Sequence, residues 1–185
     1  MKIGIFDIET SSLYANTGIF LCGIIKDYHV DETRTYRADT YPSWEKQRSD
    51  NKEVVLAFVN DLNQYDILIA HNGQYFDKTF LASACLRYGE RPSIRFTKFI
   101  DPVMLARRHM RLARNSLTAL LDYFDIEGDK TPIRWKHWMQ ATLDGNKESM
   151  DYIVEHCIVD VAKLEQVYDK VRTLVKGIDE RGSAY

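Results

Sequence analysis

The stretch Lys2–Thr10, KIGIFDIET, decides the fold and carries the first chemical signal. From Lys2 to Glu9 its residues alternate and include β-branched side chains, which predicts a strand. Residues two apart on a strand face the same side, so Asp7 and Glu9 present two carboxylates together. Such a pair needs protons or a cation, and Mg²⁺ or Mn²⁺ suits oxygen-rich sites. The alternative is a solvated strand end with chance acids.

Outward from this stretch, the pattern predicts first strands and then helices. Ile19–Tyr28 and His29–Arg37 are strand-like, and the three strands are expected to be antiparallel. After a polar loop at Asp39–Lys52, the predicted elements are a helix at Glu53–Leu62, a strand at Asp66–Ala70, a helix at Phe76–Tyr88, a strand at Ser93–Ile100, a helix from Asp101-Pro102, and helices at Ser116–Phe124, Pro132–Leu143 and Asn146–Lys176. This order predicts a single α/β domain over residues 1–185, a mixed five-stranded sheet flanked by helices.

Composition narrows the class of protein. The 185 residues are 45% hydrophobic and 28% charged with a net charge of −2, which argues against a strongly basic or acidic tail. Neither a secretory leader nor an apolar run of about 20 residues is evident, so we expect a soluble cytoplasmic protein without membrane contact. Cys22, Cys85 and Cys157 are far apart among apolar neighbours, and predict buried free thiols in a reducing compartment.

A local excess of positive charge stands out against this neutral background. Two acids, Glu90 and Asp101, lie among eight basic residues, which are Arg87, Arg91, Arg95, Lys98, Arg107, Arg108, Arg111 and Arg114. With aromatic residues interleaved, this segment favours a surface for phosphates, with Arg107 and Arg108 as candidate contacts. A solvated helix face is the alternative.

A second cluster, Ala70–Asp77 (AHNGQYFD), follows a buried strand and opens a helix. Asp77 is common at such a position simply as a helix-capping residue. The strand and glycine turn nevertheless place Asn72 and Asp77 at the carboxyl edge of the sheet, where ligands bind in open α/β folds.

The third cluster is DYIVEHCIVDV, Asp151–Val161, in which Tyr152, His156 and Asp160 recur every four residues. On a helix they form one row beside the apolar stripe. A lone histidine at such a place is usually a hydrogen-bonded core residue. A half-buried Asp160, however, needs a partner, and a metal held by Asp7, Glu9 and Asp77 would supply one.

These clusters, in this order, resemble the DEDD 3′→5′ exonucleases of the DnaQ-like, ribonuclease-H-like fold, and within them the exonuclease domains of B-family DNA polymerases. FDIET resembles the first motif of the family, HNGQYFD the second and HCIVDV the third. The resemblance implies that Asp7, Glu9, Asp77 and Asp160 hold two divalent ions, Mg²⁺ or Mn²⁺. Family members carry either tyrosine four residues before the last aspartate or histidine five before it, whereas here His156 stands at the tyrosine spacing.

The implied activity is hydrolysis of phosphodiester bonds at the 3′ end of single-stranded nucleic acid, DNA favoured, by a two-metal mechanism. His156 is expected to orient or deprotonate the attacking water. Thr10, Asn72 and Phe76 are candidate substrate contacts, and Phe20 and Tyr75 are further candidates for base stacking. An exoribonuclease, a non-catalytic nucleic-acid-binding module, and an accessory proofreading subunit with a replication or repair partner remain open, as does the oligomeric state.

Overall fold

The sheet has five strands and mixed polarity, as the sequence predicts. A computed structural model describes residues 1–127, 132 and 134–175, apart from the side chains of residues 95 and 96. The strands are β1 (Ile3–Thr10), β2 (Phe20–Asp27), β3 (Thr33–Arg37), β4 (Ile67–Ile69) and β5 (Lys98–Ile100). They lie in the order β3-β2-β1-β4-β5. β1–β2 and β2–β3 pair antiparallel, whereas β4 is parallel to β1 and to β5. The predicted α/β class is confirmed.

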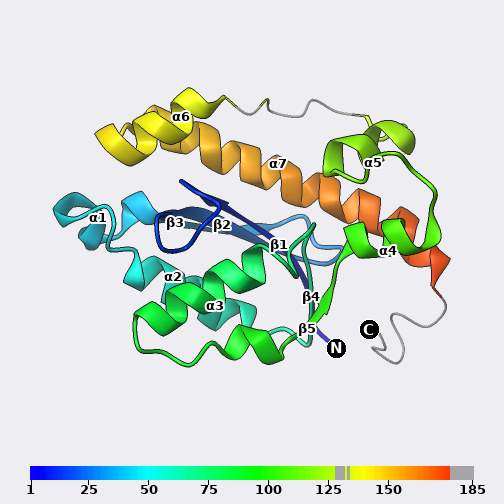
Figure 1. Ribbon diagram of the computed structural model, residues 1–185, viewed down its shortest axis with the longest axis horizontal. Coiled ribbons are helices and arrows are strands. Elements are labelled where there is room, and N and C mark those ends of the chain that lie inside the picture. The colour runs from blue at the N-terminus through cyan, green and yellow to red at the C-terminus, as the bar shows by residue number, and fades with distance from the viewer. Residues whose placement is uncertain (128–131, 133, 176–185) are drawn as a thin grey trace.

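Helices cover both faces of this sheet (Figure 1). They are α1 (Pro42–Lys46), α2 (Lys52–Leu62), α3 (Asp77–Arg87), α4 (Pro102–His109), α5 (Leu117–Tyr123), α6 (Trp135–Met139) and α7 (Lys147–Val171), with 3₁₀ turns η1 (Ala38–Thr40), η2 (Ser93–Phe96) and η4 (Arg172–Leu174) and a π turn η3 (Gln140–Asp144). The long helix α7 contacts β1 and β2 on one face, and α2 and α3 lie on the other.

The alternation of β1 separates its two faces. Phe6 is fully buried and its ring meets Phe58 of α2 edge-on at 6.0 Å. The neighbouring positions, Asp7 and Glu9, therefore face α7. β1 consequently packs Phe6 against α2 on one side and carries the acids on the other.

Some predicted boundaries are wrong. The strand expected over Ser93–Ile100 is confined to β5, because its first half turns into η2, which buries Ile94 completely and is held by a 2.7 Å hydrogen bond from Asn63 Nδ2 to Ser93 Oγ. The expected loop Asp39–Lys52 contains α1, which begins at Pro42 and buries Trp44. An apolar side chain outweighs the polar composition of that segment.

The helix starts agree with the capping residues. Asp101 accepts from Val103 N at 3.0 Å at the start of α4, and Asn146 accepts from Ser149 N at 2.8 Å at the start of α7. The predicted helix Pro132–Leu143 is shorter, since α6 begins at Trp135 and passes into η3. Residue 133 and the expected end of the last helix, Lys176, lie outside the described residues.

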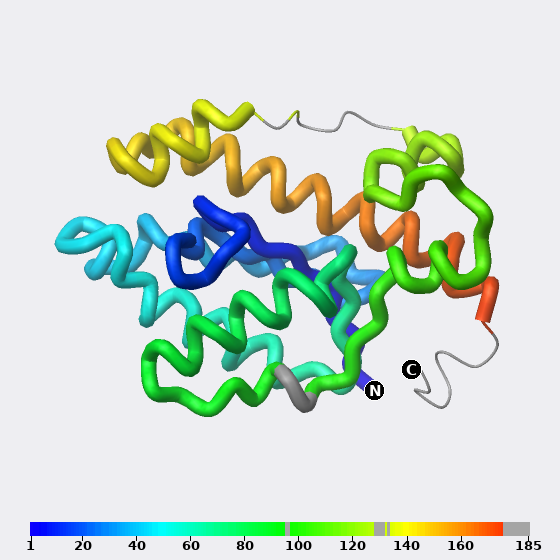
Figure 2. Tube along the Cα trace, in the orientation of Figure 1, coloured from blue at the N-terminus to red at the C-terminus, as the bar shows by residue number. Residues whose placement is uncertain are grey.

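The loop that joins β1 to β2 follows the acids of β1 and, in the view of Figure 2, lies between α3 and α7. The three cysteines are buried and free, as predicted. Among the described residues, no helix combines the length and the apolar character that crossing a membrane requires.

Candidate active site

The two acids of β1 lie under α7. Asp7 and Glu9 are both half-buried. Cys157 Sγ lies 3.5 Å from Asp7 Oδ2, and His156 Nε2 lies 3.7 Å from Glu9 Oε1. Both neighbours belong to α7, so the prediction that the two carboxylates share one face of the strand is confirmed.

Asp77 approaches the two acids of β1 from the turn that follows β4. It is the first residue of α3 and is 1% exposed. The turn between β4 and α3 needs a left-handed residue, Asn72 (φ 61°), followed by Gly73. A Cβ on Gly73 would lie 2.3 Å from Ala70 Cβ and 3.3 Å from Asp77 Oδ2, so only glycine lets the turn fold this tightly against the end of β4.

Helix α7 supplies the remaining pair. His156 and Asp160 stand one turn apart, and His156 Nε2 lies 3.7 Å from Asp160 Oδ2 as well as 3.7 Å from Glu9 Oε1. The imidazole is 1% exposed, whereas Asp160 is half-buried. Tyr152, one turn earlier, points away, because its ring stacks on His137 at 4.1 Å and its hydroxyl donates to the carbonyl of Pro132.

The four carboxylates form one electrostatic cluster. Burial raises the pKa of Glu9 well above its usual range, and the charges of Asp7 and Asp160 add to the rise. Burial also raises the pKa of Asp77, again with a contribution from Asp7, while the backbone amides of Asp77 and Ile8 oppose it. Acids from three separate segments thus repel one another inside a low-dielectric site, which a bound cation would relieve.

Trp138 is a site residue that the sequence analysis missed. It is 4% exposed, its Nε1 donates to Glu9 Oε2 at 3.2 Å, and its ring meets the imidazole of His156 edge-on, with the centroids 5.7 Å apart. α6 brings it there by packing on α7. Nothing in the local pattern around Trp138 signals this role, since it depends on how a short helix folds back.

The residues fit a divalent cation in kind. All four donors are carboxylates, the ligands that Mg²⁺ and Mn²⁺ prefer, and Asp77 Oδ1 is buried without a hydrogen-bond partner. Among the described residues, no three His, Cys, Asp or Glu side chains already converge as a preformed metal site.

Comparison of the sequence with known protein families gives one match. Residues 5–172 match RNase_H_2, a family described as RNase_H superfamily. The chain belongs to the RNase_H superfamily. No curated protein matches it. Membership of this superfamily supports nuclease activity in general and the use of divalent metals by its nucleases.

A solved structure shows the same fold. The family B DNA polymerase from the hyperthermophilic archaeon Pyrobaculum calidifontis superposes with a TM-score of 0.71 at 14% identity. The match covers 93% of this chain and 24% of the polymerase chain. The RNase_H superfamily fold of this chain thus resembles one part of a much longer protein.

The predicted substrate contacts differ in burial and in the contacts that they make. Thr10 is buried and its hydroxyl donates to the carbonyl of Ser12 at 2.8 Å. Asn72 is exposed and its backbone N donates to Asp101 Oδ1 at 3.0 Å. Phe76 is half-buried, with its ring centroid 6.0 Å from that of Phe80. Arg107 and Arg108 are exposed in the last turn of α4.

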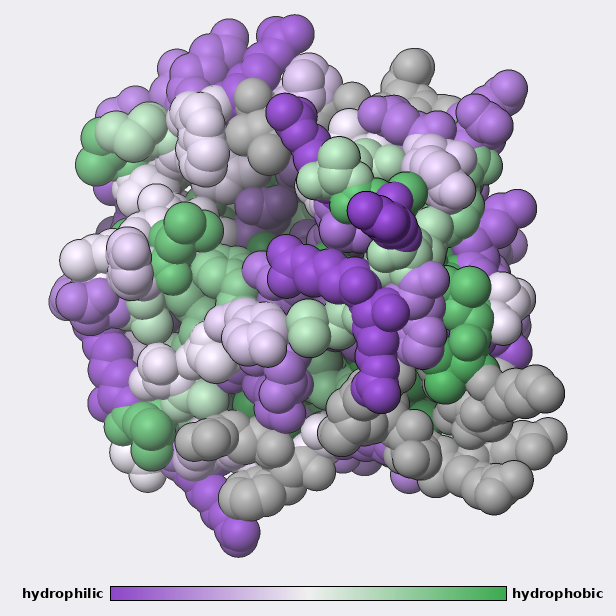
Figure 3. Space-filling view, turned by 45° about the vertical axis from the view of Figure 1, so that its right-hand side comes forward, coloured by the Kyte–Doolittle hydropathy of each residue, from purple (hydrophilic) through white to green (hydrophobic). Residues whose placement is uncertain are grey.

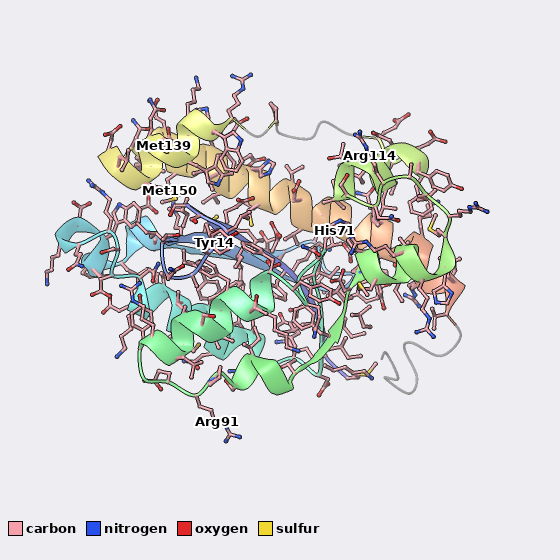
Figure 4. The ribbon with its side chains drawn as sticks, in the orientation of Figure 1. Tyr14, His71, Arg91, Arg114, Met139 and Met150 are labelled. Atoms are coloured by element: carbon pink, nitrogen blue, oxygen red, sulfur yellow. The ribbon has the colours of Figure 1, made fainter. Side chains whose placement is uncertain are left out.

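Two of the surface expectations change in the fold. Phe20 is 0% exposed, so it is a core residue and not a base-stacking platform, whereas Tyr75 is 61% exposed. The basic segment is not one surface, because Arg91 projects below α3 while Arg114 lies beside α5 at the opposite end of the view (Figure 4). The side chain of Arg95 lies outside the described residues.

Proposed function

We propose that this protein is a metal-dependent 3′→5′ exonuclease of the DEDD type that acts on single-stranded nucleic acid, with DNA the favoured substrate. The observation that carries the proposal is the electrostatic interaction of four carboxylates from β1, α3 and α7 beside a buried imidazole. Membership of the RNase_H superfamily supports a nuclease, and the order of the three sequence motifs supports the direction.

In this proposal Asp7, Glu9, Asp77 and Asp160 hold two divalent ions. When bound, the ions supply Lewis-acid stabilisation of the attacking and leaving oxygens at the phosphorus. The mixed burial of the ligands supports this arrangement, since Asp77 is fully enclosed while Asp7, Glu9 and Asp160 remain partly open to solvent.

His156 orients or deprotonates the attacking water in the proposed mechanism. Its Nε2 lies 3.7 Å from an oxygen of each of Glu9 and Asp160, so the imidazole borders the ligands directly. Trp138 limits its movement by packing edge-on against the ring. His156 lies four residues before Asp160, which is the position that tyrosine has in one group of the DEDD exonucleases.

The test is a time course on 5′-labelled and 3′-labelled single-stranded DNA and RNA of one sequence, with Mn²⁺, Mg²⁺ or EDTA. Progressive shortening from the 3′ end that EDTA and Asp7→Ala both abolish supports the exonuclease, and the preferred strand identifies the substrate. Shortening of RNA alone favours the exoribonuclease. Binding without cleavage in either metal contradicts the proposal and favours a module that holds nucleic acid.

A further inference from the structure

A pocket of about 430 Å³ lies beside the edge strand β5, between the start of α3 and α4. Its size is within the ~300–1,000 Å³ range of small-molecule sites. The lining residues used below are Tyr75, Lys78, Lys98, Phe99, Met104 and Arg108. The four predicted metal ligands do not line it. Figure 3 shows one face of the molecule, on which green hydrophobic and purple hydrophilic side chains lie next to one another.

The charged side chains around this pocket favour an anion. Lys78, Lys98 and Arg108 contribute three positive charges from three different elements, in a chain whose net charge is −2. One acid, Asp101, also lines the pocket. Its Oδ1 accepts the backbone N–H groups of Asn72 and Val103, both at 3.0 Å, and the side chain is 7% exposed. The Asp101 carboxylate therefore binds the backbone, and the other three charged side chains that line the pocket are cationic.

The uncharged side chains favour a flat aromatic group. Phe99 is held in place, since its ring meets Phe6 edge-on at 5.6 Å and lies under Lys78 Nζ, 5.1 Å from the ring centroid. Tyr75 is 61% exposed on an anchored turn, where its backbone N donates to Asn72 O and its carbonyl accepts from Thr79 Oγ1 at 2.6 Å. An exposed ring on a fixed backbone is a ready platform for a nucleobase.

The pocket is a neighbour of the candidate active site. Tyr75 belongs to the same turn that ends at Asp77. Asp101, at the carboxyl end of β5, joins this turn to the start of α4 through its two hydrogen bonds. A strand whose 3′ end occupies the acids of β1 and α7 can therefore reach the pocket along the same edge of the sheet.

We propose that this pocket is a subsite for one nucleotide of the substrate strand, upstream of the scissile bond. Its base stacks on Tyr75 against the apolar wall of Phe99 and Met104, and its phosphate binds Lys98, Lys78 and Arg108. This assignment rests on the proposed exonuclease function, because it takes the strand's 3′ end to lie at the carboxylates. A free nucleoside monophosphate offers the same chemistry, so the experiment separates the two sources.

The experiment measures binding in EDTA, where no metal supports cleavage. Unlabelled oligothymidylates from two to about ten nucleotides, and dTMP, compete with a 5′-fluorescein-labelled decathymidylate, read by fluorescence anisotropy. The variants are Tyr75→Ala, Lys98→Ala and Arg108→Ala. Matched controls are Tyr123→Ala, an exposed tyrosine on α5, and Lys170→Ala, an exposed lysine on α7. Urea unfolding establishes that each variant is folded.

We expect Tyr75→Ala to weaken binding of the longer oligonucleotides by about fivefold or more, at the lower end of base-stacking effects. Each of Lys98→Ala and Arg108→Ala should lower the slope of log K against log salt by about one. The loss should become smaller as the strand is shortened toward the dinucleotide, and both controls should be unchanged.

Three results overturn the assignment: no loss at any length, an equal loss for the dinucleotide and the longest strand, or binding of dTMP to the pocket as tight as that of the longest strand. Failure of the exonuclease proposal looks different. Wild-type protein would then leave the strand uncut in Mn²⁺, while the length-dependent losses in EDTA would still show where a strand binds.

Discussion

Replacing Trp138 by phenylalanine tests how far the site depends on a residue outside the carboxylate cluster. The substitution keeps an aromatic ring against His156 but removes the indole N–H that donates to Glu9 Oε2 at 3.2 Å. A hydrogen bond to a charged group contributes about 1.5–3 kcal/mol, which corresponds to roughly 10- to 100-fold in an equilibrium constant. Loss of an outer-shell partner of a metal ligand costs a similar factor. We therefore expect the apparent affinity for Mn²⁺ to fall by about 10- to 100-fold.

The assay is the initial rate of shortening of a 5′-labelled DNA strand as a function of Mn²⁺ concentration. Trp138→Phe should need more metal to reach half of its maximal rate, and saturating Mn²⁺ should restore most of the activity. Trp135→Phe is the matched control, because Trp135 is 67% exposed on the same short helix. A metal dependence identical to that of the wild type would refute the reasoning that this hydrogen bond holds Glu9 as a ligand.

Three further outcomes are expected. His156→Ala should lower the cleavage rate at saturating metal by about 10²-fold, the usual scale for a general base, whereas His156→Tyr should retain substantial activity; an unchanged rate in His156→Ala would remove the imidazole from the mechanism. Gly73→Ala should cost about 1–3 kcal/mol in urea unfolding, because the added Cβ would lie 2.3 Å from Ala70 Cβ; a smaller cost would mean that the turn relaxes easily. Burial raises the pKa of Asp77, so without metal the folded protein holds a proton that the unfolded chain releases, and stability should fall as pH rises above the ordinary range of an aspartate carboxyl; Asp77→Asn should flatten this decline in urea unfolding in EDTA, and an equally steep decline would contradict it.

The acids of the site were predictable because each signal is local. The period of a strand places Asp7 and Glu9 on one face, and the period of a helix places His156 and Asp160 in one row. The glycine turn before Asp77 predicts the end of a strand. The need of Asp160 for a partner suggested that these segments form one cluster, and the resemblance to a family strengthened this hypothesis, since no local pattern measures the distance between β1 and α7.

The features that escaped prediction depend on packing between distant segments. Trp138 lies 129 positions from its partner Glu9 and reaches it only because α6 folds back along α7. The basic segment looked continuous in sequence, but the chain turns between Arg91 and Arg114 and carries them to different parts of the surface. Ser93 lies in the first half of the predicted strand Ser93–Ile100, whereas in the structure its hydroxyl accepts a hydrogen bond from Asn63 and holds a turn.

The hydrogen bonds of Asp101 have a consequence for how this protein can diversify. Its carboxylate accepts hydrogen bonds from the main-chain N–H groups of Asn72, in the turn after β4, and Val103, in the first turn of α4. Any residue other than proline offers such a group. The side chains that surround the pocket can therefore be exchanged while the turn that ends in Asp77 stays where it is. Under the proposed function, selection can alter which strand is bound without moving the carboxylates of the candidate active site.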